Sequence, residues 1–221
     1  WGFGAMVLAT IFAAVGFDFW PLAGLPALAL ILYISVVDFK KIFWLLIACL
    51  PLSTEIVLPN GFGTDLPTEP LMVGLTGLTF LFALHHTDRL RGDYLRHPIT
   101  LLLLGHVSWV LVSTVTSDLA FVSIKFFLAK LWYVVPFYFL AGYILRDQTD
   151  LRRLFWVFFL PLLLTVCIIM VRHGLQGFTF NAIHYVLSPF QRNHVIYAAI
   201  LAYFFPVLFF PFISEHDSIY G

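Results

Sequence analysis

The chain has 221 residues, of which 61% are hydrophobic and 11% charged, and its formal net charge is zero. A soluble domain is about 45–50% apolar and about 25% charged, so this composition excludes an ordinary water-soluble fold and predicts a membrane protein. The balanced charge and the lack of a dense basic stretch in the sequence argue against nucleic-acid binding.

Eight apolar segments, separated by polar loops, follow one another along the chain. Because an apolar helix of about 20 residues crosses a bilayer, they predict an all-α, polytopic transmembrane bundle with about eight spans, forming one transmembrane domain over residues 1–221. The predicted spans are 2–17, 21–37, 42–52, 71–85, 99–116, 121–145, 154–171 and 195–213. The short third segment is either extended by its neighbours or only partly inserted. Since the chain starts and stops close to apolar stretches, we expect it to be the N-terminal part of a longer protein.

The basic residues are distributed unevenly between the loops. Eight of the twelve fall in alternate loops, namely Lys40, Lys41, Arg89, Arg91, Arg96, Arg146, Arg152 and Arg153. Loops rich in Lys and Arg stay on the cytoplasmic side of a membrane. This distribution predicts that the N-terminus and these loops are inside, and that loops 17–20, 53–70, 117–120 and 172–194 are outside. The tryptophans, Trp44 among them, are expected to face lipid or the interface and not to form a stacking site.

The four remaining basic residues, Lys125, Lys130, Arg172 and Arg192, fall in the outer loops or the outer halves of spans. Lys130 follows about ten residues of the sixth span, which places it roughly 15 Å deep. An ammonium group at such a depth costs about 2.5–3.5 kcal/mol and usually faces a bundle interior or an aqueous cavity. We therefore expect a functional role or a buried ion pair for Lys130. Lys125 has two equally weighted interpretations, the same role or extension of its side chain to the interface.

The outer loop 53–70 combines turn-forming residues with carboxylates. Pro59-Asn60-Gly61 predicts a tight turn, and Thr68 or Asp65 is expected to cap the fourth span. Glu55 has two equally weighted interpretations, a residue of the turn or a carboxylate held over a substrate site.

The outer loop 172–194 gathers two arginines, three histidines and Asn193 at one membrane face. Because the planar guanidinium fork suits phosphate, Arg172 and Arg192 predict an anion site, and His194 is the histidine best placed to join it. The three histidines are 11 and 10 residues apart, which fits no common zinc pattern, so no metal is expected.

Four runs of sequence carry a resemblance to a known family. They are PLSTEIVLPNGFGTDLPTEPLM at 51–72, HPITLLLLGHVSWVLVSTVTS at 97–117, SIKFFLAKLWYVVPF at 123–137 and SPFQRNHVIYAAIL at 188–201. Together they resemble the O-antigen ligase and polymerase-like family, and more narrowly the O-antigen ligase family proteins of Bacteroidetes-type bacteria. The resemblance implies a metal-independent, cofactor-free glycosyltransferase of the bacterial inner membrane with a GT-C-like helical fold. Such an enzyme transfers a glycan from undecaprenyl pyrophosphate to lipid A-core or another glycan acceptor at the periplasmic face.

Members of this family use outer-face arginines, a feature that Arg192 matches and for which Arg172 is a second candidate. They also use a histidine in a large periplasmic loop, which we expect beyond residue 221 and do not assign to His194. In this interpretation Arg192 and Arg172 contact the pyrophosphate, and Arg192 stabilises the charge on the departing oxygen. Lys125 and Lys130 line the cavity beneath and, with His194, contribute to substrate binding; Glu55 positions an acceptor hydroxyl or pairs with a lysine.

Two other classes of function stay open. One is a transporter or lipid-linked sugar flippase, in which Lys130 is a substrate or coupling site at mid-depth; the sequence contains no inverted repeat that would favour it. The other is a non-catalytic membrane scaffold, for which the outer basic residues are incidental.

Overall fold

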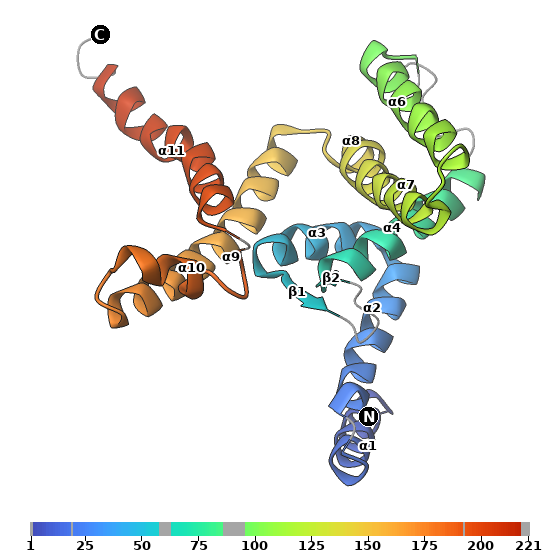
Figure 1. Cartoon of the computed structure of the whole chain (residues 1–221), viewed down its shortest axis with the longest axis horizontal. Helices are drawn as coiled ribbons and strands as arrows, with labels where there is room; N and C mark the ends of the chain where they lie inside the picture. The colour runs from blue at the N-terminus through green and yellow to red at the C-terminus, as the bar shows by residue number, and fades with distance from the viewer. Residues whose placement is uncertain (1, 19, 58–62, 86–95, 192, 218–221) are drawn as a thin grey trace. The chain divides into compact units, whose positions relative to one another are not determined.

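The computed structural model describes residues 2–18, 20–57, 63–85, 96–191 and 193–217 (Figure 1). The described chain is mostly helical, and its contacts divide it into two units. The first unit comprises Trp1–Ile47 and Glu69–Phe155, and the second comprises Ala48–Thr68 and Trp156–Gly221.

Each of the eight predicted apolar segments coincides with helical structure. The described helices are α1 (Gly2–Gly16), η1 (Trp20–Gly24), α2 (Leu25–Val37), α3 (Phe39–Cys49), η2 (Leu50–Leu52), α4 (Thr68–His85), α6 (Pro98–Val115), α7 (Ala120–Val134), η4 (Val135–Leu140), α8 (Ala141–Ile144), α9 (Gln148–Leu175), η5 (Phe180–Ala182), α10 (Ile183–Val186) and α11 (His194–Asp217). The described strands are β1 (Thr54–Val57) and β2 (Gly63–Leu66).

Three helical stretches are long and apolar enough to cross a membrane: Pro98–Val115, Ala120–Ile144 and Gln148–Leu175, with 18, 25 and 28 residues. At 1.5 Å per residue, α9 is about 42 Å long and exceeds the hydrocarbon core of about 30 Å. Figure 1 shows α9 as one uninterrupted helix. Shorter apolar helices occupy Gly2–Gly16, Leu22–Ile31, Thr68–Leu84 and His194–Pro206.

The short third segment forms a buried helix. α3 has 11 residues, about 17 Å, which is less than the thickness of a hydrocarbon core. It is followed by η2 and then by β1, so its neighbours do not extend it to spanning length. Ile42, Phe43 and Leu46 are 2%, 1% and 0% exposed, so this helix packs against protein.

The sixth predicted span contains a wide helical turn. α7 continues through the π-helical segment η4 into α8. Because Pro136 has no N–H, it removes a regular α-helical hydrogen bond, and the Ala141 N–H bonds to the Pro136 carbonyl five residues back. The Tyr138 hydroxyl lies 2.7 Å from that of Thr100, which joins this turn to α6.

The loop 53–70, which was predicted to lie outside, contains a β-hairpin that sequence analysis did not predict. β1 and β2 are antiparallel, and the register pairs Glu55 with Asp65. The turn predicted at Pro59-Asn60-Gly61 lies outside the described residues.

Thr68 joins the hairpin to the following helix. It is the first residue of α4, not the residue before it as expected for an N-cap. The Thr68 hydroxyl lies 2.7 Å from Ser53 Oγ and donates to the Asp65 carbonyl at 3.3 Å. The two ends of the loop are therefore held together where α4 begins.

Candidate functional site at the end of α9

The end of α9 is fixed by a glycine cap. Gly177 has a φ of +68°, and its N–H bonds to the Gly174 carbonyl at 3.0 Å. The Phe178 N–H bonds to the His173 carbonyl at 3.0 Å, which completes a Schellman motif. The Phe178 ring packs edge-on against the His173 ring, with centroids 5.2 Å apart. His173 Nε2 lies 3.1 Å from the Thr179 carbonyl, so this histidine is engaged in the cap itself.

The chain after this cap folds back on the last turns of α9. Ile169 of α9 packs against Val186 and Leu187, and all three are buried; Ile183 and Tyr197 pack around them. We call the described residues of the segment 169–197 the outer cap. Its small apolar core gives the polar residues on its surface a defined position.

Arg172 forms a hydrogen bond across the outer cap. Its Nη1 donates to the carbonyl of Ser188, sixteen residues later in the chain. A guanidinium has five N–H donors, so this bond orients the group while it uses only one of them. Arg172 is half-buried, and its other donors can serve an anionic ligand.

Two exposed histidines meet on the outer cap. The rings of His184 and His194 are edge-to-face with centroids 4.9 Å apart. His194 is the first residue of α11, and Asn193 caps this helix because its Oδ1 accepts the Ile196 N–H at 2.8 Å. Asn193 is thus a helix cap in the structure. Imidazole N–H groups beside a helix N-terminus form a suitable environment for an anion.

Glu55 also belongs to the second unit. Its carboxylate lies across Gly63, where an added Cβ would come 2.9 Å from Glu55 Oε1. Asp65 is its partner in the strand register, so the two acidic residues sit opposite one another in the hairpin. Gly63 is therefore required for the observed position of the Glu55 side chain.

The predicted lysines lie in the first unit. Lys125 and Lys130 are both in α7 and both half-buried. In the described part of the chain, no carboxylate lies within 4.0 Å of Lys130, so the ion pair considered for it is not found there. Arg172 and His194 are in the other unit, and Arg192 lies outside the described residues. The pocket that combines these residues stays a prediction.

The environment of Trp44 differs from the prediction. It is 8% exposed, so it does not face lipid. Its ring lies beneath the Arg153 guanidinium, with the Cζ carbon 4.6 Å from the ring centroid. This stacking contact joins residues more than a hundred positions apart. Trp44 was predicted inside the third span and Arg153 in a loop, so the sequence did not indicate that they would meet.

No group of three His, Cys, Asp or Glu side chains suited to a metal ion occurs in the parts of the chain that the structure describes. Comparison with protein-family models, with curated proteins and with solved structures gives no match to this chain. The evidence on function is therefore the geometry of the outer cap and the distribution of basic residues along the chain.

Proposed function

We propose that the protein is a bacterial inner-membrane glycosyltransferase of the O-antigen ligase or polymerase type, built as a GT-C-like bundle with about eight membrane segments, of which the third, α3 with η2, is short. Its donor is a glycan carried by undecaprenyl pyrophosphate, and its acceptor is lipid A-core or another glycan at the periplasmic face. The observation that carries the proposal is the outer cap, which presents Arg172, His184 and His194 on a packed platform after a long apolar helix.

The chemistry of transfer requires fixed positive charge where a pyrophosphate departs. The acceptor oxygen bonds to the anomeric carbon, the bond from that carbon to the pyrophosphate oxygen breaks, and the electron pair leaves with the pyrophosphate. Positioned donors that stabilise such developing charge usually lower the activation barrier more than any other effect in an active site. The Ser188 carbonyl already orients Arg172, so less conformational entropy is lost when it binds phosphate.

Arg192 is placed in this proposal by its position in the sequence, two residues before His194. It contacts the pyrophosphate together with Arg172, and His194 binds the same group. Lys125 and Lys130 line the cavity below, and Glu55 positions the acceptor hydroxyl or pairs with a lysine. A general base takes the acceptor proton.

The proposed orientation is supported by the first unit. Lys40 and Arg153 come from two of the three loops predicted to be cytoplasmic, and they line one cavity. Loops that lie at the same membrane face are expected to meet in this way. The outer cap, at the other end of α9, then faces the periplasm.

The test is glycan transfer by the purified full chain with undecaprenyl-pyrophosphate-linked glycan as donor. We expect Arg192→Ala to lower the transfer rate by about 10²–10³-fold, the usual effect of removing a charge-stabilising donor. Arg152→Ala is the matched control, because it removes an exposed arginine from the predicted cytoplasmic side, and its rate should stay at the wild-type level. A wild-type transfer rate for Arg192→Ala would contradict the assignment of Arg192 to the catalytic site.

One observation favours a lipid-linked sugar flippase as the second candidate. Lys130 is half-buried without a carboxylate within 4.0 Å among the described residues, and the π-helical turn η4 begins five positions later. Intramembrane cations and π-helical turns both occur frequently at functional sites. The test measures movement of the lipid-linked glycan across the membrane of proteoliposomes. Movement that occurs without glycan transfer to an acceptor, and that Lys130→Gln abolishes, would favour this candidate over the transferase.

A further inference from the structure

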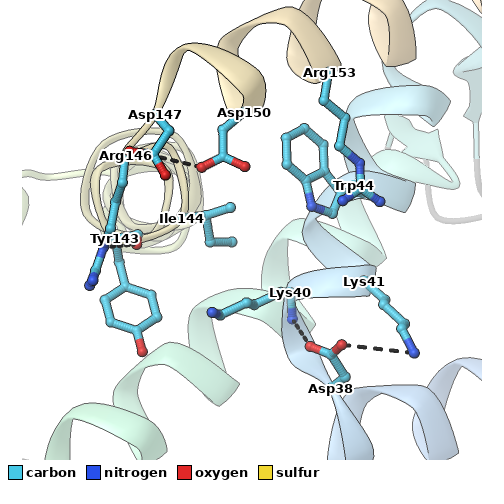
Figure 2. Close-up of a pocket in the computed structure, with 10 residues that line it drawn as sticks. All are labelled: Asp38, Lys40, Lys41, Trp44, Tyr143, Ile144, Arg146, Asp147, Asp150 and Arg153. Carbon is cyan, nitrogen blue, oxygen red and sulfur yellow. Dashed lines mark hydrogen bonds and ion pairs between the residues drawn. The ribbon is translucent and has the colours of Figure 1, made fainter.

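A second polar site lies in the first unit, where α3 begins and where α8 leads into α9. A cavity of about 350 Å³ opens there, close to the lower end of the usual range for ligand sites. Figure 2 shows its basic side chains arranged around Ile144, with Arg153 beside Trp44 and Lys40 extending toward Tyr143. We call this site the basic pocket.

Three carboxylates line the basic pocket, those of Asp38, Asp147 and Asp150, and two of them are engaged at the starts of helices. Asp38 precedes α3, its Oδ1 accepts the Lys40 N–H at 3.2 Å, and its Oδ2 lies 3.8 Å from Lys41 Nζ. Asp150 is in the first turn of α9, where its Oδ2 accepts the Arg146 N–H at 3.2 Å. The helix dipole stabilises acidic side chains at these positions.

The cations of the basic pocket are not balanced in the same way. Lys41 pairs with Asp38, but within the described ranges Lys40, Arg146 and Arg153 have no carboxylate within 4.0 Å of their charged nitrogens. Their charges rest on aromatic faces instead. Lys40 Nζ and Arg146 Cζ lie 5.4 and 4.9 Å from the Tyr143 ring centroid, and Arg153 stacks on Trp44.

The aromatic rings that support these cations are themselves held by protein. Trp44, in α3, is buried. The Tyr143 ring packs against Phe39 and Phe82, with centroids 6.4 and 5.4 Å apart. These rings hold three cations around one cavity. The lining of the cavity has four basic and three acidic side chains, so it carries one net positive charge that an anion can balance.

We propose that the basic pocket binds the phosphate group of an anionic phospholipid headgroup at the cytoplasmic face. The chemistry recognised is a phosphate ester. A lipid source is favoured because the site begins a 28-residue apolar helix and combines aromatic with basic side chains, which is typical of headgroup sites between membrane helices. Lipid binding here requires the orientation proposed above and is independent of glycosyl transfer.

The test counts lipids bound to the purified full chain in a neutral detergent by native mass spectrometry. Phosphatidylglycerol is titrated against phosphatidylcholine for the wild type, for Arg153→Gln and for the matched control Arg152→Gln. Arg152 is the neighbour of Arg153 in α9 and is exposed as Arg153 is, but it does not line the cavity. We expect the Kd for phosphatidylglycerol to rise about tenfold or more in Arg153→Gln, since a charged hydrogen-bond donor is lost, and to stay within about twofold in Arg152→Gln.

Lys40→Gln is the second variant, because it leaves the Arg153 contact with Trp44 intact. It should also weaken phosphatidylglycerol binding, and such a result could not come from a folding defect specific to Arg153→Gln. Equal weakening by Arg152→Gln, or equal binding of both lipids by the wild type, would overturn the proposal. Competition by inorganic phosphate at the concentration of the lipid would overturn the lipid assignment. Because the readout is bound lipid, the result does not depend on whether glycan transfer is observed.

Discussion

Tyr143 is the residue on which most ring contacts of the basic pocket converge, and its replacement by leucine has a predictable cost. The Tyr143 ring contacts Phe39, Phe82, Lys40 and Arg146. Aromatic pairs contribute about 0.5–1.5 kcal/mol each beyond buried area, and cation–π contacts at exposed sites about 0.5–1 kcal/mol each. Because neighbouring contacts are not additive, we expect Tyr143→Leu to lower the free energy of unfolding by about 2–4 kcal/mol.

The measurement is reversible unfolding of the full chain by sodium dodecyl sulfate in mixed micelles, followed by circular dichroism. Tyr143→Phe is the control, because it keeps the ring and therefore every contact named above. Its free energy of unfolding should stay within about 0.5 kcal/mol of the wild-type value. If Tyr143→Leu and Tyr143→Phe unfold alike, the ring contacts do not stabilise the first unit and the reasoning fails.

Three further predictions concern packing and backbone conformation. Leu46→Ala should lower the free energy of unfolding by about 2–5 kcal/mol, because Leu46 is 0% exposed. Leu45→Ala is the control and should cost clearly less, because Leu45 is 37% exposed. Equal costs in sodium dodecyl sulfate titrations would contradict the burial of α3. Tyr138→Phe should cost about 0.6 kcal/mol, since it removes the bond to Thr100, and a cost above about 2 kcal/mol in the same assay would show that other contacts were missed. Gly177→Ala should speed amide hydrogen exchange in the outer cap, because a left-handed φ is unfavourable for alanine by about 1–2 kcal/mol. An added Cβ meets nothing within 4 Å there, so the effect comes from the backbone conformation and not from a clash. Gly177→Asn should exchange almost as the wild type does, and equal rates for the two variants would argue against the Schellman cap.

The positions of the helices could be predicted well from the sequence. Long apolar runs are recognisable because a membrane requires backbone hydrogen bonds to be satisfied within one segment, and both ends of α6 lie within one residue of the predicted span. α9 extends beyond its predicted span at both ends and includes Arg152 and Arg153, which were predicted in a loop. The hairpin was missed since each strand has only four residues, too few for a clear alternation of polar and apolar side chains.

The contacts of the two candidate sites could be predicted less well. An aromatic residue in an apolar run can face lipid or protein, so nothing local distinguished buried Trp44 from Trp109, which is 72% exposed. The contact of His184 with His194 could likewise not be predicted, because it depends on how Val186 and Leu187 pack on α9. Clustering of charged loops on one side hinted at the basic pocket, but the stacking partners of Lys40, Arg146 and Arg153 are set by tertiary structure.

The most direct test of the proposed orientation uses the two ends of α9. In a background of Cys49→Ser and Cys167→Ser, single cysteines are placed at Gln148, where α9 begins, and at Tyr185 in the outer cap, both exposed positions. Intact spheroplasts are treated with a membrane-impermeant maleimide before and after permeabilisation. We predict labelling of Tyr185→Cys in intact spheroplasts and of Gln148→Cys only after permeabilisation. Labelling of both cysteines in intact spheroplasts, or the reverse pattern, would contradict a helix that crosses the membrane with the basic pocket inside and the outer cap outside.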